Sequence, residues 1–143
     1  MKRRSRAREV AFQVLYQAEV NPGVAAGDRE RFLAGRLRSA ALVEFATALV
    51  DGVGRHREAI DAALQARATN WRVARMAATD RAVLRLAVYE LQHTDTPGPV
   101  IVDEAIELAR RYGGENSPRF VAGVLGGMLE GGPAAADSGT PAA

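Results

Sequence analysis

Apolar residues recur with the period of an α-helix along most of the chain, and no segment shows the strict apolar-polar alternation of a half-buried strand. The first nineteen residues show this clearly, because one helix face collects Ala7, Val10, Ala11, Val14, Leu15 and Ala18. A chain of 143 residues can bury roughly two-thirds of its unfolded surface, as one domain or two very small subdomains. The pattern predicts an all-α fold, a compact bundle of about seven helices.

Turn and capping residues predict where the helices begin and end. The first helix should run from about Arg4 to Val20 and stop at Asn21-Pro22-Gly23, before a loop over residues 21–30. A second helical region is expected over about 30–53, a weaker helix over about 55–68, and a short helical turn from Asn70 and Trp71 to about Met76 and Ala77.

The segment ATDRAVLRLAVYEL, residues 78–91, is the most apolar and should be the core helix, capped by Thr79 or Asp80. A further helix should start near Pro99 and stop at Gly113-Gly114. The last one should be capped by Ser117 and bury Phe120, Val121, Val124, Leu125, Met128 and Leu129. Residues 1–130 form the predicted domain. Residues 131–143, rich in Gly, Ala and Pro, form a predicted disordered tail.

A dense cluster of positive charge opens the chain and points towards nucleic acid, in the side chains of Lys2, Arg3, Arg4, Arg6 and Arg8. A helical projection leaves these cations outside the core and directs Tyr16 away from the apolar face. An outward aromatic ring beside arginines can stack on an unpaired base, which duplex DNA does not offer. We therefore expect single-stranded RNA as the ligand. A merely solvated basic end and a transit peptide are the alternatives, and Glu9 and Glu19 weaken the second.

Composition excludes several classes of protein. The net charge is only +2, so RNA binding would depend on local patches. The chain has no cysteine, which excludes disulfides and thiol chemistry and is compatible with a cytoplasmic protein. No stretch approaches the roughly 20 apolar residues of a membrane helix.

Residues that could carry catalysis are sparse. His56 and His93 lie far apart, outside any metal-ligand motif, and are interpreted as surface or packing residues. The acidic residues of 103–107 favour a helix start over a metal or acid-base site. Trp71 is interpreted as an anchor between helices, with RNA stacking as the alternative. We predict no enzyme activity, no cofactor and no metal.

Four blocks of sequence carry a resemblance to a known family. They are RRSRAREVAFQVLYQAE at 3–19, DRAVLRLAVYEL at 80–91, VDEAIELARRYG at 102–113 and SPRFVAGVLG at 117–126. In this order and separation they resemble the NusB antitermination factors over about residues 3–130. The resemblance implies two small helical subdomains.

The resemblance also implies a function. Members bind the boxA element of nascent ribosomal RNA together with NusE, a small-subunit ribosomal protein, and join elongating RNA polymerase to suppress termination. The basic start of the first helix matches the family's RNA contacts. The resemblance assigns an RNA contact to Tyr16 and contacts with the protein partner to Asp80, Glu115, Asn116, Arg119 and Phe120.

The chain departs from the family pattern at three positions: Ala122 replaces a common Asn, Gly126 a common Asp, and Asn116 a common acidic residue. Two alternative functions stay open. One is a helical adaptor that binds only proteins. The other is a stand-alone relative of the domain that guides RNA cytosine methyltransferases.

Overall fold

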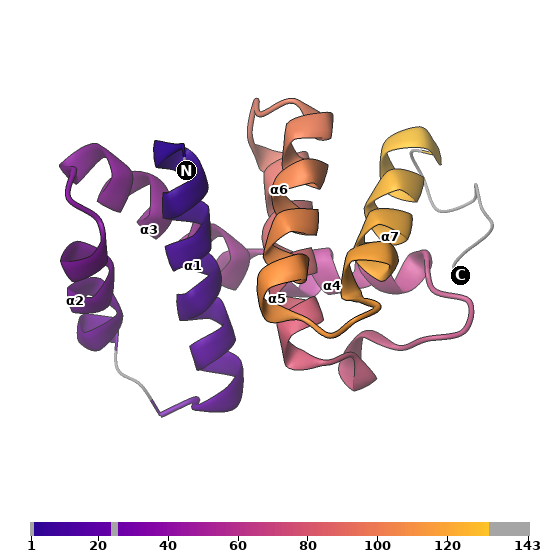
Figure 1. Ribbon diagram of the computed structural model, residues 1–143. Helices are drawn as coiled ribbons and strands as arrows, with labels where there is room; N and C mark the ends of the chain where they lie inside the picture. The colour runs from indigo at the N-terminus through magenta and orange to yellow at the C-terminus, as the bar shows by residue number, and fades with distance from the viewer. Residues whose placement is uncertain (1, 24–25, 132–143) are drawn as a thin grey trace.

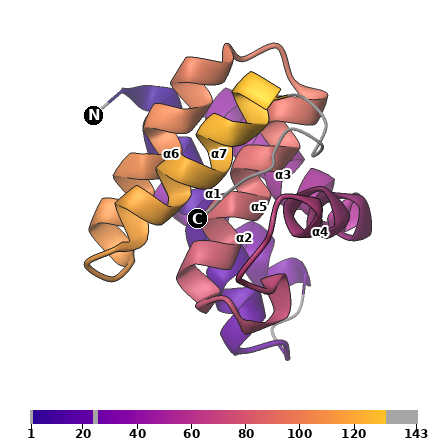
Figure 2. The same ribbon diagram turned by 90° about the vertical axis from the view of Figure 1, so that its right-hand side faces the viewer.

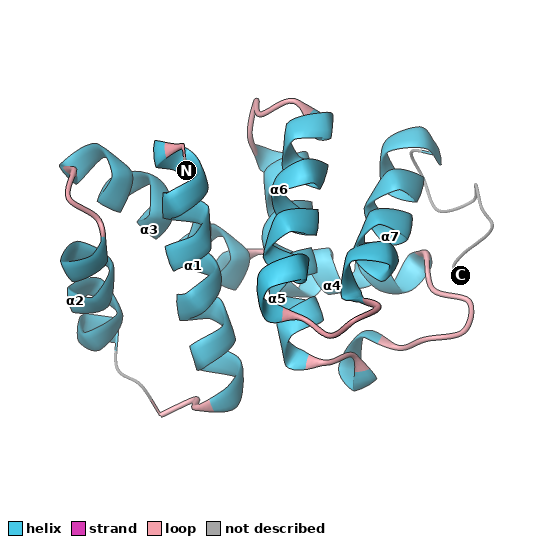
Figure 3. Cartoon of the chain, viewed as in Figure 1, coloured by secondary structure: helices cyan, strands magenta, loops and turns pink. Residues whose placement is uncertain are grey.

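The computed structural model describes residues 2–23 and 26–131, and every regular element within these ranges is helical (Figure 3). In chain order the elements are α1 (Arg3–Val20), α2 (Ala26–Arg36), α3 (Ala40–Arg55), α4 (Arg57–Ala66), the 3-10 turn η1 (Val73–Arg75), α5 (Ala78–His93), α6 (Gly98–Tyr112) and α7 (Ser117–Gly131). The prediction of an all-α fold with about seven helices is confirmed.

The helices form two groups that lie side by side, α1–α3 in one and α4–α7 in the other (Figure 1). α1 packs against α3 within its own group and against α5 across the boundary, while α6 packs against α5 and α7. Buried apolar side chains of both groups belong to one continuous cluster. The two small subdomains therefore share a single core.

α5 is the core helix that the sequence predicted. All residues from Ala82 to Val88 are buried, because α5 packs against α1, α3, α4, α6 and α7. Its predicted cap was wrong, since the helix begins at Ala78 with Ala77 as its N-cap and Asp80 already in the first turn. The guanidinium of Arg81 donates to the carbonyls of Val73 (3.1 Å) and Met76 (2.7 Å), which ties η1 to the helix start.

The region from 21 to 53 differs most from the prediction. The expected loop over 21–30 is too long, because α2 already begins at Ala26. The single helical region expected over 30–53 is two helices, and Ser39 separates them by accepting a hydrogen bond from the amide of Leu42 (3.3 Å). Leu33 and Leu37 at the end of α2 are buried, so tertiary packing sets the break between the two helices.

A set of buried or half-buried ion pairs, which we call the ion-pair seam, joins α1 to α4 and α5. Its members are Arg8, Glu19, Asp61, Arg81, Arg85 and Glu90. Glu19 of α1 accepts from Arg81 and from Arg85 (2.7 Å), and Arg85 also donates to Asp61 (2.8 Å). Desolvation alone would raise the pKa of Glu19, but the hydrogen bonds from the two arginines outweigh it and lower that pKa.

The junction between α3 and α4 brings together two histidines that are distant in sequence. The rings of His56 and His93 stack with their centroids 4.1 Å apart, and Tyr89 stacks on His93 at 5.0 Å. The interpretation of both histidines as surface or packing residues agrees with this contact. Tyr89 also lies so close to Gly52 that an added Cβ would be 2.2 Å from its ring, so Gly52 is required there.

The start of α7 is within one residue of the prediction. Ser117 is its first residue rather than its cap, and its Oγ accepts from the amide of Gly114 (3.0 Å). Leu129 was expected in the core, but 44% of it is exposed. The tail predicted to be disordered is residues 131–143: Gly131 is the last residue of α7, and residues 132–143 lie outside the described residues.

Candidate nucleic-acid and partner interface

The N-terminal end of α1 presents an exposed basic cluster. Lys2, Arg3 and Arg4 are exposed and Arg6 is half-buried. The guanidinium of Arg4 lies over the ring of Phe45 in α3, 4.5 Å from its centroid. The free amides at this helix end add a partial positive charge. These four cations can meet phosphates as the sequence predicted, and we call them the basic end of α1.

Arg8 is different, and the expectation that it lies outside the core was wrong. Only 4% of the residue is exposed, and its guanidinium donates two hydrogen bonds to the carboxylate of Glu90, at 2.8 and 2.9 Å. α5 packs against α1 and brings Glu90 to this side of the helix. Arg8 therefore joins two helices and is closed to phosphates.

Tyr16 does not point outward as predicted. Its half-buried ring packs against the hydrophobic core and stacks with Phe12, with the centroids 6.1 Å apart. Because α5 also packs against α1, residues outside the apolar stripe of α1 face the core as well. Tyr16 thus offers less ring surface to a base than the sequence predicted.

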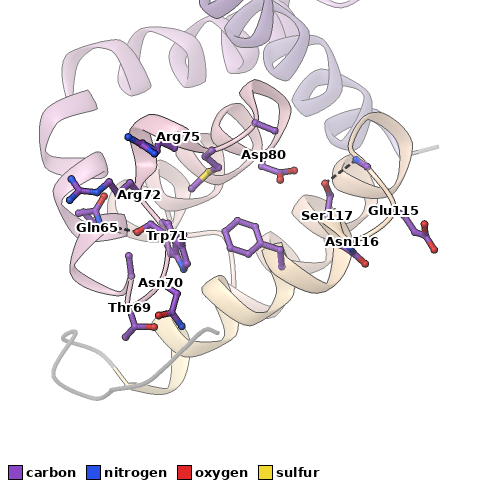
Figure 4. A pocket seen from close by; sticks show the side chains of 15 residues that line it. Gln65, Thr69, Asn70, Trp71, Arg72, Arg75, Asp80, Glu115, Asn116 and Ser117 are labelled. Carbon is purple, nitrogen blue, oxygen red and sulfur yellow. Dashed lines mark hydrogen bonds between the residues drawn. The ribbon is translucent and has the colours of Figure 1, made fainter.

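A groove of about 1180 Å³ lies between the segment 68–80 and the connection from α6 to α7 (Figure 4). Four of the five residues that the resemblance assigned to a partner line it, namely Asp80, Glu115, Asn116 and Phe120. Arg119 is exposed on α7 but is not among the lining residues. The fold thus brings the first turn of α5 beside the start of α7, across a separation of more than thirty residues.

The groove has an aromatic wall with two unpaired polar atoms. Trp71 meets Phe120 edge to face, with the ring centroids 5.4 Å apart. The indole nitrogen of Trp71 and one carboxylate oxygen of Asp80 are buried without a hydrogen-bond partner among the described residues. Trp71 therefore both anchors helices, as predicted, and lines the groove.

Arg72 and Arg75 also line the groove, and the sequence reasoning missed them. Both are exposed and neither forms an ion pair within the described part of the chain. The two arginines follow the only Trp of the chain within the segment NWRVAR, so the sequence did contain a signal for them. Their positive charge lies on the wall opposite Glu115 and Asn116 (Figure 4).

Glu9 is the second feature that sequence reasoning missed. Its carboxylate accepts hydrogen bonds from Arg6 (2.8 Å), Arg111 (3.0 Å) and the Tyr112 hydroxyl (2.6 Å). Desolvation would raise the pKa of Glu9, but these three hydrogen bonds outweigh it and lower that pKa. Glu9 thus stays ionised and holds an arginine from α1 beside one from α6.

Two absences hold for the residues that the structure describes. No group of three or more His, Asp or Glu side chains there could hold a metal ion. None of the described helices combines the length and the apolar character needed to span a membrane.

The chain is similar to known proteins over nearly all of its length. The NusB family model matches residues 5–130. The transcription antitermination protein NusB of Anaeromyxobacter dehalogenans is 49% identical, over 93% of this chain and 94% of that protein. NusB from T. maritima has a TM-score of 0.80 at 34% identity, covering 91% of this chain and 92% of that one.

A second similar structure contains a protein partner and RNA. It is a crystal structure of the antitermination factors NusB and NusE in complex with double-stranded RNA, with a TM-score of 0.79 at 28% identity over 91% of this chain and 98% of that one. This structure agrees with the family match and with the similar relative. The chain belongs to the NusB family.

Proposed function

We propose that this protein is an RNA-binding transcription antitermination factor that acts with NusE. It would bind boxA-like nascent ribosomal RNA and help RNA polymerase to read through terminators, as a non-catalytic factor in the cytoplasm. Family membership supports this proposal, and so does the similar NusB–NusE complex with RNA. The observation that carries it is the exposed basic end of α1, where Lys2, Arg3 and Arg4 have no neighbouring carboxylate within ion-pair distance among the described residues.

We assign the RNA and the protein partner to neighbouring surfaces of the molecule. The basic end of α1 lies at the top of that helix in Figure 1, and the connection from α6 to α7 lies lower in the same view. The two surfaces adjoin, because Arg6 of the basic end and Tyr112, the last residue of α6, both hydrogen-bond to Glu9. The RNA would bind at the basic end. NusE would bind at the groove, where Asp80 and Glu115 can pair with cations of the partner and Arg72 and Arg75 with its anions.

Titration of a boxA-like RNA with and without NusE tests the proposal. If the two ligands bind to adjoining surfaces, each raises the affinity for the other by the same factor. Asp80→Lys should weaken NusE binding more than RNA binding, and Arg6→Ala should do the reverse. Absence of RNA binding both with and without NusE would refute the proposed function and revive a purely protein-binding adaptor.

The strandedness of the RNA needs its own measurement, because the similar complex contains double-stranded RNA. We expect the single strand to bind more tightly, since exposed bases can stack where a duplex cannot. The half-buried ring of Tyr16 makes this preference smaller than the sequence alone predicted. The experiment compares a single strand with its own duplex at one salt concentration.

A further inference from the structure

Two arginines from different helices share one carboxylate on the surface between α1 and α6. Nη1 of Arg6 lies 2.8 Å from one oxygen of Glu9, and Nη1 of Arg111 lies 3.0 Å from the other. The two guanidiniums are therefore held next to each other although 105 residues separate them in the sequence. This pair of guanidiniums, which we call the arginine fork, can bind two neighbouring anionic groups.

The carboxylate that holds this pair is fixed in place. Glu9 is buried, and the hydroxyl of Tyr112 donates to it (2.6 Å) while accepting from the amide of Gln13 (2.9 Å). A buried side chain with three hydrogen-bond donors has little freedom to move. Glu9 therefore fixes where the two guanidiniums lie, instead of leaving them as mobile surface side chains.

Both arginines keep donors free for a ligand. The side chains of Arg6 and Arg111 are 40% and 39% exposed. Each guanidinium has five N–H donors, and Glu9 receives one hydrogen bond from each arginine. The remaining donors of each guanidinium can reach a phosphate that approaches from solvent.

Two of the neighbouring carboxylates have partners of their own. Glu104 accepts from Ser5 (2.5 Å) and lies 3.9 Å from Arg8, and Glu107 pairs with Arg110 and more distantly with Arg111. Among the carboxylates beside Arg111 in the described part of the chain, only Asp103 is exposed without an ion pair. These pairs reduce the repulsion that a phosphate would meet near Arg111.

Arg111 also lies beside the basic end of α1. It lines one surface hollow of about 360 Å³ together with Lys2 and with the carboxylates of Glu9, Asp103, Glu104 and Glu107. It is the penultimate residue of α6, immediately before the connection that borders the groove. Its position is thus between the two surfaces that the proposed function assigns to RNA and to NusE.

We propose that Arg111 is a further contact for an RNA phosphate, and that Glu9 is the positioning residue that holds Arg111 beside Arg6. This inference rests on the proposed function and adds α6 to the RNA-binding surface. The ligand is a phosphodiester of the same RNA strand that binds the basic end of α1. RNA would continue from α1 along α6 towards the groove.

Replacement of Arg111 tests the contact, with Arg110 as a matched control. Arg110 carries the same charge on the same helix, but its ion pair is with Glu107 and not with Glu9. Arg111→Ala should make the salt slope of RNA binding shallower by about 0.7, the value for one phosphate of a single strand. Between about 50 and about 200 mM salt, this makes the loss of affinity about 2.6-fold smaller than in the wild type.

Arg110→Ala should leave that slope unchanged. Equal slopes for the wild type and Arg111→Ala would overturn the proposal, as would equal effects of the two replacements. If Arg6→Ala still weakens RNA binding while Arg111→Ala does not, the proposed function survives and only this inference fails. If no basic residue affects RNA binding, the proposed function itself fails.

Glu9→Gln separates positioning from simple electrostatics. The variant removes one negative charge beside the two arginines, so a purely electrostatic effect would tighten RNA binding. Loss of the fixed fork should instead weaken binding several-fold and make the slope shallower, as Arg111→Ala does. Tighter binding would overturn the positioning role.

Because Glu9 is buried, circular dichroism and thermal melting must show that Glu9→Gln is folded. Tyr112→Phe, which removes one hydrogen bond to Glu9, is the milder second variant with the same expected direction.

Discussion

The basic end of α1 and the ion-pair seam both contain arginines, in opposite surroundings. Arg3 and Arg4 are exposed, whereas Arg8, one turn further along the same helix, is 96% buried against Glu90. A guanidinium in solvent can bind a phosphate, while one that is enclosed with a carboxylate holds two helices together. The difference lies in what a distant helix places opposite the side chain, and not in the residue type.

This contrast has energetic consequences. Removal of one exposed charge usually changes stability by at most about 0.5 kcal/mol. Removal of one member of a buried pair leaves the other charge enclosed and unpaired, which costs about 3 to 5 kcal/mol. Replacements in the basic end should therefore affect mainly RNA binding, and replacements in the ion-pair seam should affect mainly stability.

Arg8→Ala should give the largest effect, because it leaves Glu90 buried without its partner. We expect the free energy of unfolding in urea to fall by about 3 to 5 kcal/mol. Arg3→Ala, the exposed control, should change it by at most about 0.5 kcal/mol. The double variant Arg8→Met, Glu90→Leu should recover most of the loss, since it removes both buried charges. Equal stabilities of Arg8→Ala and Arg3→Ala would break the comparison.

Leu84→Ala tests the apolar part of the same core. Leu84 is completely buried in α5, so we expect a loss of about 2 to 5 kcal/mol in urea unfolding. Leu129→Ala is the control, because Leu129 is exposed at the end of α7. If both replacements lowered the free energy of unfolding equally, Leu84 would not belong to the core.

The salt dependence of RNA binding tests the exposed region. If Lys2, Arg3, Arg4 and Arg6 each meet a phosphate of a single strand, the log–log slope should be about −3, from about −0.7 per phosphate. Replacement of the three arginines by Ala should reduce the slope by about 2 and leave the circular dichroism spectrum unchanged. A flat titration of the wild type would contradict the electrostatic role of this end.

The smallest effect concerns the acid stability contributed by Glu19 of the seam and by Glu9. The pKa values of Glu9 and Glu19 are lowered in the folded protein from their ordinary value of 4.5. The unfolded chain therefore binds more protons in acid, so these groups contribute stability above that value and lose it as the pH falls below it. Glu19→Gln should make the melting temperature less dependent on pH in this range.

A control for that measurement is Glu44→Gln, which removes a negative charge at an exposed position on α3. A wild-type melting temperature that stays constant as the pH falls below 4.5 would contradict a contribution of the seam. Loss of the pH dependence in Glu44→Gln alone would place that contribution outside the seam.

Most of the fold could be predicted because helix signals are local. The end of α1 at Asn21, the start of α6 near Pro99 and the burial of α5 each follow from residues within a few turns of one another. The division between α2 and α3 was missed, although Ser39 is a good N-cap residue, because the apolar pattern continues across it. The groove residues were named from the resemblance, and their binding role stays a prediction.

The amino-acid sequence by itself determined the all-helical class, the core helix and the basic start of the chain, because helical period and net charge are properties of neighbouring residues. Only the tertiary structure decided which cations are available. Glu90 lies 82 residues from Arg8, and Arg111 lies 102 residues from Glu9. Burial and pairing depend on which helices pack together, so local spacing could not tell the arginine that binds a helix from the arginines that face solvent.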